Sequence, residues 1–311
     1  VVEARVKRPL LQRMTRQILK ESLPRAWIFT PAVKLGQAFR PLLPSTLRKK
    51  LPAKQASGVW PQTSHSRKMI LHAGCAQPAL LPNINAATAR VLDQVGVQVV
   101  LAAKAACCGA IRFHLHDQAA ALDDMRRNID AWWPWLEAGQ VEAIISTASG
   151  CGVMLKDYGH LLAHDAAYAS KAAKVAALSR DISEVLVPFC AQLRTKLITK
   201  KTPQKLAYHP PCTLQHGQRL AGQVEGVLAD IGIALQPCQD SHLCCGSAGT
   251  YSLLQSEIAH QLRNNKLRHL QQLQPDTIIT ANLGCQMHLQ SGTNIPVKHW
   301  IEVLDQALQS E

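Results

Sequence analysis

The sequence predicts an α/β protein built from two tandem cysteine-rich repeats, each a parallel sheet flanked by helices, preceded by a basic helical arm. Three observations support this prediction: a duplicated cysteine pattern, an alternation of short apolar segments with amphipathic ones, and positive charge concentrated near the N-terminus. Strands that alternate with helices favour parallel sheets covered by helices. We place the arm and linker at residues 1–66, the first repeat at 67–200 and the second at 201–311.

The duplicated pattern is Cys … Cys-Cys-Gly … Gly-Cys, and it uses eight of the ten cysteines. The first cysteine and the adjacent pair recur 137 residues later, and in each copy another cysteine follows a glycine downstream. The two quartets are Cys75, Cys107, Cys108 and Cys151, and Cys212, Cys244, Cys245 and Cys285. This register indicates a duplicated domain with one thiolate-lined site in each copy.

The arm carries most of the net charge of +13, since residues 1–54 hold thirteen Lys and Arg against Glu3 and Glu21. Apolar residues spaced as in a helix lie between Leu10 and Leu19, and four prolines between Pro41 and Pro61 predict a linker. The arm is expected either to pack on a partner or absent domain, or to bind anionic lipid headgroups. Nucleic acid is disfavoured because aromatic residues are not interleaved with the charge.

The elements of the two repeats follow the same order. In the first repeat we expect strands at 69–71, 97–101 and 143–146, helices at 83–95, 117–136, 152–163, 166–176 and 181–193, and a short apolar piece at 175–178. In the second we expect strands at 205–208, 233–235 and 277–280, an apolar piece at 295–297, and helices at 222–231, 256–273 and 300–308. Each repeated cysteine follows a predicted strand, where parallel sheets place their ligands.

Thiolates are soft ligands that select iron–sulfur clusters, zinc or Cu(I), and four of them suit either a cluster or a structural zinc ion. Neighbouring side chains diverge in a strand, so a Cys-Cys pair needs either a sharp loop or a target larger than one ion. The glycine after the pair permits positive φ and leaves room for a bulky inorganic group. An iron–sulfur cluster is therefore the favoured interpretation. Zinc, dithiol redox chemistry and merely buried cysteines are the alternatives.

Other residues are expected to play supporting or structural roles. His72 and His209 each lie three residues before the first cysteine of a copy, where a histidine usually hydrogen-bonds to the ligands. His242 is a weaker candidate of the same kind. Cys190 and Cys238 have no counterpart in the other copy and are expected to be ordinary thiols. The run Trp132-Trp133-Pro134-Trp135 is expected to be a core or interface plug, far from the cysteine loops.

Composition excludes several classes of protein. No apolar run approaches the ~18–20 residues of a membrane span, and there is no signal-peptide pattern. Ten cysteines without a secretory signal fit a reducing cytoplasm, where such clusters bind metal or carry out redox chemistry. The chain begins at Val1, so an upstream part is expected to be missing. No catalytic triad, P-loop or Rossmann fingerprint stands out, so nothing indicates that this chain alone binds a flavin or carries out hydride chemistry.

The two patterns resemble the tandem CCG domains found in heterodisulfide reductases and in related iron–sulfur oxidoreductases. Longer blocks are similar to the iron–sulfur subunits of bacterial glycolate oxidases. They are Gly74-Cys75-Ala76-Gln77-Pro78, residues 85–92, Thr147-Ala148-Ser149-Gly150-Cys151-Gly152, Cys212-Thr213-Leu214-Gln215-His216, and residues 240–251. The resemblance covers nearly the whole chain, the arm included.

That family implies electron transfer. A flavin subunit oxidises glycolate to glyoxylate, and the iron–sulfur subunit passes electrons towards a quinone or another acceptor. The resemblance implies cysteine-bound clusters of the [4Fe–4S] type, flavin-containing partner subunits, and a cytoplasmic location, peripheral on the inner face of the cytoplasmic membrane. It also implies an N-terminal ferredoxin-like domain, and this sequence has no such cysteine runs. Subunits of lactate, glycerol-3-phosphate and heterodisulfide systems are similar.

The sequence departs from the broad CCG pattern at one position in each copy. That pattern ends in Cys-x-x-Cys, and the first of these positions holds Ala148 in one copy and Asn282 in the other. Each site thus has four cysteines instead of five, which leaves an ordinary cluster, a zinc ion or one empty site open. A zinc-stabilised docking module and a thiol–disulfide reductase are the rival functions.

Overall fold

Two four-stranded parallel sheets form the centre of the protein, as the sequence predicts. The computed structural model describes residues 8–197 and 205–309. The first sheet has the order β2-β1-β3-β4 and the second β6-β5-β7-β8, so the two repeats have the same topology. The strands are β1 Arg67–Leu71, β2 Val97–Val100, β3 Ile144–Ser146, β4 Ser179–Asp181, β5 Leu206–His209, β6 Leu235–Gln236, β7 Thr277–Thr280 and β8 Val297–His299.

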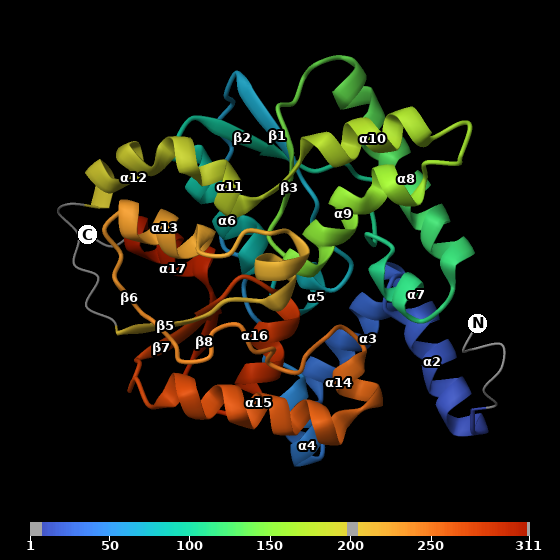
Figure 1. The fold of residues 1–311 in the computed structure, drawn as a ribbon, viewed down its shortest axis with the longest axis vertical. Helices are drawn as coiled ribbons and strands as arrows, with labels where there is room; N and C mark the ends of the chain where they lie inside the picture. The colour runs from blue at the N-terminus through green and yellow to red at the C-terminus, as the bar shows by residue number, and fades with distance from the viewer. Residues whose placement is uncertain (1–7, 198–204, 310–311) are drawn as a thin grey trace.

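Helices cover both sheets (Figure 1). Those of the first repeat are α5 Gln77–Leu80, α6 Asn83–Asp93, α7 Ala110–His114, α8 Gln118–Glu137, α9 Ser149–Leu161, α10 Ala169–Leu178, α11 Ile182–Leu186 and α12 Cys190–Leu197. Those of the second are α13 Gln223–Asp230, α14 Tyr251–Leu254, α15 Ser256–Gln271, α16 Leu283–Gln290 and α17 Trp300–Gln309, with a π-helical turn at Thr213–Gly217. Continuous apolar runs, such as Ile144-Ile145 in β3 and Ile278-Ile279 in β7, are buried on both faces, as parallel sheets require.

The fourth strand of each sheet lies later in the chain than expected. The apolar piece at 175–178 belongs to the end of α10, and the edge strand is Ser179–Asp181, which carries mostly polar residues. In the second repeat the apolar piece at 295–297 leads into β8, Val297–His299. The helix expected at 181–193 is divided by a 3₁₀ turn at Val187–Phe189, where Pro188 interrupts regular α-helical hydrogen bonding.

The arm has more helical structure than the sequence predicts. The expected helix is α2, Leu10–Ser22, but α3 (Ala26–Ala38) follows it, and α4 (Ser45–Lys50) lies inside the predicted linker. Pro31 is tolerated inside α3, and Pro44 immediately precedes α4, where its fixed φ suits a helix start. The arm packs on the body through α3 against α5 and α4 against α16. It therefore does not extend freely from the repeats.

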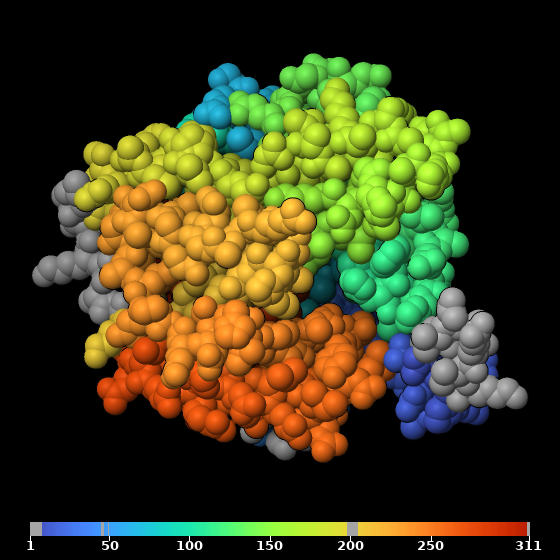
Figure 2. Space-filling view, in the orientation of Figure 1, coloured from blue at the N-terminus to red at the C-terminus, as the bar shows by residue number. Residues whose placement is uncertain are grey.

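One apolar core spans both repeats, and two smaller cores lie within the single repeats. The shared core contains Leu71 and Ile145 from the first sheet together with Tyr208 and Ile279 from the second. Helices α6 and α17 pack against each other across this boundary (Figure 1). In the space-filling view the green and yellow first repeat lies above the red end of the second (Figure 2). The repeats thus form one packed body.

Candidate metal centres

In each repeat the first candidate cysteine lies just beyond the first strand of the sheet. Strand β1 ends at Leu71, and the buried His72 and half-buried Cys75 follow it directly. In the second repeat His209 is the last residue of β5, and Cys212 comes three residues later. The loop after β1 turns at Gly74, whose φ is +77°. Both imidazoles and both first cysteines therefore lie at the carboxyl ends of the strands, as predicted.

The Cys-Cys pairs sit on turns that only glycine can close. Gly109 and Gly246, which follow the pairs, have φ of +93° and +86°. A Cβ atom at Gly109 would lie 3.0 Å from the carbonyl oxygen of Ala121, and one at Gly246 would lie 2.4 Å from that of Ala259. Positive φ and the lack of space both exclude a side chain. The glycine of each Cys-Cys-Gly thus lets the pair lie directly against a helix.

The last cysteine of each quartet lies in the first turn of a helix. Cys151 is in α9, which begins at Ser149, three residues earlier than expected, and Cys285 is in α16, which begins at Leu283. The free N–H groups and the dipole of a helix N-terminus favour an anion, so both positions stabilise a thiolate.

The structure brings each predicted set together. His72, Cys108 and Cys151 have ligand atoms within 4.8 Å of one another, and so do His209, Cys245 and Cys285. The Sγ atoms of Cys212 and Cys244 are 3.9 Å apart. Cys75 interacts with Cys107 in the same way as Cys212 with Cys244. Each quartet is thus one continuous group of sulfur atoms.

The thiols alternate in acidity, with the same order in both copies. A hydrogen bond from the thiol of Cys108, together with the smaller effect of His72, lowers the pKa of Cys151 to about 6. A hydrogen bond from the thiol of Cys245, together with the smaller effects of His209 and Asn282, lowers the pKa of Cys285 to about 5. The pKa values of Cys107 and Cys244 are also lowered by their neighbouring thiols, whereas those of Cys75, Cys108, Cys212 and Cys245 are raised. In each site two of the four thiols are thus shifted towards the thiolate form, which suits a cation.

The hydrogen bonding of His72 and His209 indicates whether a metal group fits these sites. His72 and His209 are buried, and within the described residues neither ring nitrogen of either one has a hydrogen bond of normal geometry. A buried polar group without a partner is unfavourable and calls for an unseen ligand or ion. Because both rings face thiols, a metal group bound there would provide that partner. The donor set of sulfur and imidazole suits iron–sulfur clusters and zinc.

The first site is supported by a polar network that was not predicted from the sequence. Asn128 donates to the carbonyl oxygen of Cys107 (2.7 Å) and accepts from the backbone N–H of Ala106 (2.8 Å). The hydroxyl of Tyr158 donates to the carbonyl oxygen of Cys108 (3.0 Å). These bonds fix the backbone of the Cys-Cys pair. Asn128 lies among apolar residues on the buried face of α8. A polar residue on such a face is the one feature of the sequence that could have predicted this network.

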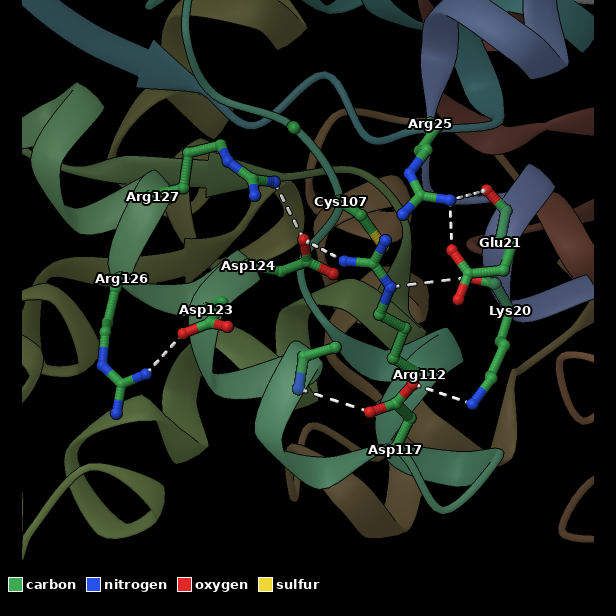
Figure 3. Close-up of polar contacts among 12 residues, drawn as sticks. Lys20, Glu21, Arg25, Cys107, Arg112, Asp117, Asp123, Asp124, Arg126 and Arg127 are labelled. Atoms are coloured by element: carbon green, nitrogen blue, oxygen red, sulfur yellow. Dashed lines mark hydrogen bonds and ion pairs between the residues drawn. The ribbon is translucent and has the colours of Figure 1, made fainter. Parts of the chain in front are cut away.

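A buried ion pair lies beside the same cysteine pair. Arg112 and Asp124 are joined at 2.7 Å, and Figure 3 shows them next to Cys107. Burial and, next, the charge of Cys107 raise the pKa of Asp124. Arg112 also donates to the carbonyl oxygen of Lys20, whose ammonium pairs with Asp117 at 2.9 Å (Figure 3). Helix α2 of the arm is thus anchored close to the first site.

The tryptophan run corrects another expectation. Trp132 is a fully buried core residue, as predicted, but it does not lie far from the cysteine loops. Its ring makes an edge-to-face contact with His72 (centroids 5.7 Å apart) and stacks with Tyr158. Cys190 and Cys238 are buried and belong to neither metal-binding group of the described residues.

Comparison with known proteins agrees with this geometry. The cysteine-rich domain family CCG matches residues 69–156 and 206–290. The glycolate oxidase iron-sulfur subunit of Escherichia coli is 48% identical over the whole of this chain, which spans 75% of that protein. The chain belongs to the glycolate oxidase iron–sulfur subunit family.

More distant relatives differ in length, and some carry another name. The probable glycolate oxidase iron-sulfur subunit of Bacillus subtilis is 28% identical over 73% of this chain and 50% of its own length. Lactate utilization protein A of Geobacillus thermodenitrificans is 26% identical over 76% of this chain and 98% of its own length. Among solved structures, an aspartate racemase of Picrophilus torridus aligns over 79% of this chain and 93% of its own, at 14% identity and a TM-score of 0.34.

Within the described part of the chain, none of the helices has the length and apolar character needed to span a bilayer.

Proposed function

We propose that this chain is the iron–sulfur electron-transfer subunit of a glycolate-oxidising complex. The observation that supports this most is the pair of matching cysteine quartets at the strand ends of the two repeats. Each quartet lies beside a buried imidazole whose ring nitrogens have no hydrogen bond of normal geometry within the described residues. Relatives from Escherichia coli and Bacillus subtilis carry the name of such a subunit. The chain itself is proposed to be non-catalytic.

The proposed ligands are the eight repeated cysteines, four to each site. A bound cluster of the [4Fe–4S] type takes up and releases single electrons, and four thiolates are its usual ligands. The chain contributes the low-pKa thiols and the glycine turns that bring them together. His72 and His209 are proposed to hydrogen-bond to the ligands or the cluster, since both are buried beside thiols.

The proposed partners are flavin-containing subunits that oxidise glycolate to glyoxylate, with a quinone or another acceptor receiving the electrons. A lactate-oxidising system is the second candidate, because the lactate utilization protein relative matches 76% of this chain. The flavin partner determines the substrate. Co-expression with each candidate flavin subunit, followed by co-purification and dye reduction with glycolate or lactate, separates the two.

Metal analysis after anaerobic purification tests the cofactor. We expect iron and sulfide in equal amounts, a visible absorption that bleaches with dithionite, and loss of about half the iron in a Cys245→Ser, Cys285→Ser double variant. The matched variant Cys190→Ser, Cys238→Ser removes two buried thiols outside both sites and should keep all the iron. Iron-free protein, with all ten thiols open to alkylation, would exclude the proposal.

Zinc is the alternative cofactor, and one distance favours it. Two thiolates bound to one tetrahedral zinc ion at about 2.3 Å have sulfur atoms slightly under 4 Å apart, close to the 3.9 Å between Cys212 and Cys244. A zinc-bound chain would serve as a docking module for the flavin subunit. Stoichiometric zinc without iron, and no redox-dependent spectrum, would support this alternative.

The arm is proposed to attach the chain to a partner or to the inner surface of the cytoplasmic membrane. Helix α2 exposes Leu10, Leu11, Met14 and Ile18 next to basic residues, although its other end is anchored at Asp117. An exposed apolar stripe bordered by cations is typical of helices that lie in a membrane interface.

A further inference from the structure

The two candidate sites share their cysteines but differ in the charge around them. Asn128 in α8 and Lys266 in α15 occupy equivalent places, since each lies seven residues after the alanine whose carbonyl oxygen contacts the Cys-Cys-Gly glycine. Asn128 is neutral, whereas Lys266 carries an ammonium group. Lys266 is only 3% exposed. The buried ammonium of Lys266 therefore lies beside the second site, and the neutral amide of Asn128 takes the equivalent position at the first.

The charge of Lys266 is not neutralised by a buried carboxylate. Its ammonium donates to the backbone carbonyl oxygen of Asp240 at 2.6 Å, and no ion pair of Lys266 occurs within the described residues. Burial lowers the pKa of Lys266, while Cys238, Cys245, Asp240 and Cys244, all within electrostatic range, favour its charged form. The Asp240 carboxyl is half exposed, so water screens its influence.

The cation at the first site is compensated. Arg112 is paired with Asp124, which is 1% exposed, so this buried pair adds no net charge. Arg127 also contacts Asp124, but half of its side chain is exposed. Of Arg112, Arg127 and Lys266, only Lys266 is a buried cation without a carboxylate partner in the described residues, and it lies beside the second site.

A second difference lies at the position that lacks a fifth cysteine. Asn282 donates from its side-chain nitrogen to Sγ of Cys285 at 3.5 Å. Ala148, its counterpart before Cys151, has no side-chain group that can donate. Hydrogen bonds to ligand sulfur atoms and positive charge nearby both stabilise the more negative, reduced form of a cluster. The two differences act in the same direction.

We infer that Lys266 and Asn282 make the second site the one with the higher reduction potential. This ranking rests on the proposed iron–sulfur function. Both residues are positioning residues that act on the electronic properties of the bound group and do not themselves react. The first site is accordingly the stronger reductant of the two.

Reduction potentials of single-site proteins test this ranking. Cys108→Ser with Cys151→Ser leaves only the second site, and Cys245→Ser with Cys285→Ser leaves only the first. After anaerobic reconstitution, iron and sulfide are counted and each potential is measured by titration followed by electron paramagnetic resonance. We expect the second site to be at least tenfold easier to reduce, which is about 59 mV for one electron.

Single substitutions then identify the cause. Lys266→Gln and Asn282→Ala should each lower the potential of the second site, and Ala148→Asn should raise that of the first. Arg268→Gln is the matched control, because it removes an exposed cation from the same helix and should leave the potential unchanged. A second site at or below the first, or Lys266→Gln and Asn282→Ala variants that match the Arg268→Gln control, would overturn the inference.

The proposed function fails in a different way. If wild-type protein and both single-site proteins bind no iron and sulfide, the iron–sulfur function is wrong and the ranking falls with it. If clusters are present but their potentials do not follow the pattern above, the ranking alone is wrong.

Discussion

At the scale of single residues, equivalent positions of the two repeats cap a helix with different side chains, a carboxylate in the first repeat and an imidazole in the second. Asp181 ends β4 and caps α11 by accepting from the backbone N–H of Ser183. His299 ends β8 and caps α17 in the same way, accepting from Ile301 through Nδ1 (3.2 Å). The other ring nitrogen of His299 donates to the carbonyl oxygen of Thr147 in the first repeat (2.8 Å). The histidine thus joins a helix cap to an inter-repeat contact.

His299 should make stability depend on pH. Burial lowers its pKa to about 4, below the ordinary value of 6.5. The folded protein therefore binds fewer protons than the unfolded chain between these values. Stability from the neutral ring is full above pH 6.5 and is lost as pH falls towards 4, by about 2 kcal/mol at pH 5.

Urea unfolding between pH 7.5 and pH 5 measures this effect. His299→Asn should be less stable at pH 7.5, because the bond to Thr147 is lost, but should lose less further stability on acidification than wild type. Burial raises the pKa of Asp181 to about 6, which acts in the opposite direction, so the difference between variant and wild type is the informative quantity. The control is His164→Asn, at an exposed position. An unchanged pH dependence in His299→Asn would contradict the prediction.

At the scale of elements, the Cys-Cys-Gly turns depend on backbone geometry. Gly246→Ala should destabilise the protein by more than the ~1–2 kcal/mol of a left-handed L-residue, since its Cβ would also collide with the carbonyl oxygen of Ala259. Denaturant unfolding and metal content measure the cost. Gly232→Ala is the matched variant: its φ is +89°, but nothing lies within 4 Å of the added atom. Equal costs for the two substitutions would refute a role for the close contact.

Helix α2 should bind anionic membranes through its exposed apolar face. Leu11 is 75% exposed and Ile18 is 61% exposed, and they lie seven residues apart on one side of the helix. Leu11→Asp with Ile18→Asp should reduce co-sedimentation with phosphatidylglycerol vesicles several-fold. Gln12→Asp with Gln17→Asp adds the same charge to the same helix and should reduce it less. Equal losses would mean that charge alone governs binding.

Much of the fold and the site was predictable because it rests on local patterns. The repeated cysteines, the apolar strands before them and the glycine turns are all visible in the sequence. Helix α4 and the edge strand β4 were not, because a six-residue helix after proline and a three-residue polar strand carry no periodic signal. The partners of Asn128 and Lys266 depend on which helix face is buried, which tertiary packing decides.

At the scale of the whole molecule, a largely buried ion pair joins the repeats. Arg90 in α6 contacts both carboxylate oxygens of Asp305 in α17, at 2.7 Å for Nη2 and Oδ2 and 3.0 Å for Nε and Oδ1. The two side chains are 17% and 8% exposed. These residues are 215 positions apart, so no sequence pattern links them. The pair fixes how one repeat lies on the other.

Breaking this pair should be costly. Asp305→Asn leaves the largely buried guanidinium of Arg90 without a carboxylate partner, although Arg90 still donates to Val59 and Asn83. We expect a loss of up to about 3 kcal/mol in the free energy of unfolding. Arg67 and Glu142 form a similar two-bond pair whose side chains are 45% and 42% exposed, so Glu142→Gln should cost under about 1 kcal/mol. Denaturant unfolding compares the two variants, and a similar small loss in both would show that the inter-repeat pair does not hold the domains together.

Ser149 connects the loops of the two candidate sites by hydrogen bonds. Its backbone N–H donates to the carbonyl oxygen of Ala281 (3.3 Å), and its hydroxyl lies 2.7 Å from that of Thr213. Ser149 comes two residues before Cys151, and Thr213 comes directly after Cys212, so the loops of the two candidate sites are hydrogen-bonded to each other. A shift of one loop on cofactor binding would therefore act on the other. We expect cooperative cofactor uptake in a titration of wild-type protein and weaker cooperativity in Ser149→Ala, with each site raising the affinity of the other by the same factor, as thermodynamic reciprocity requires.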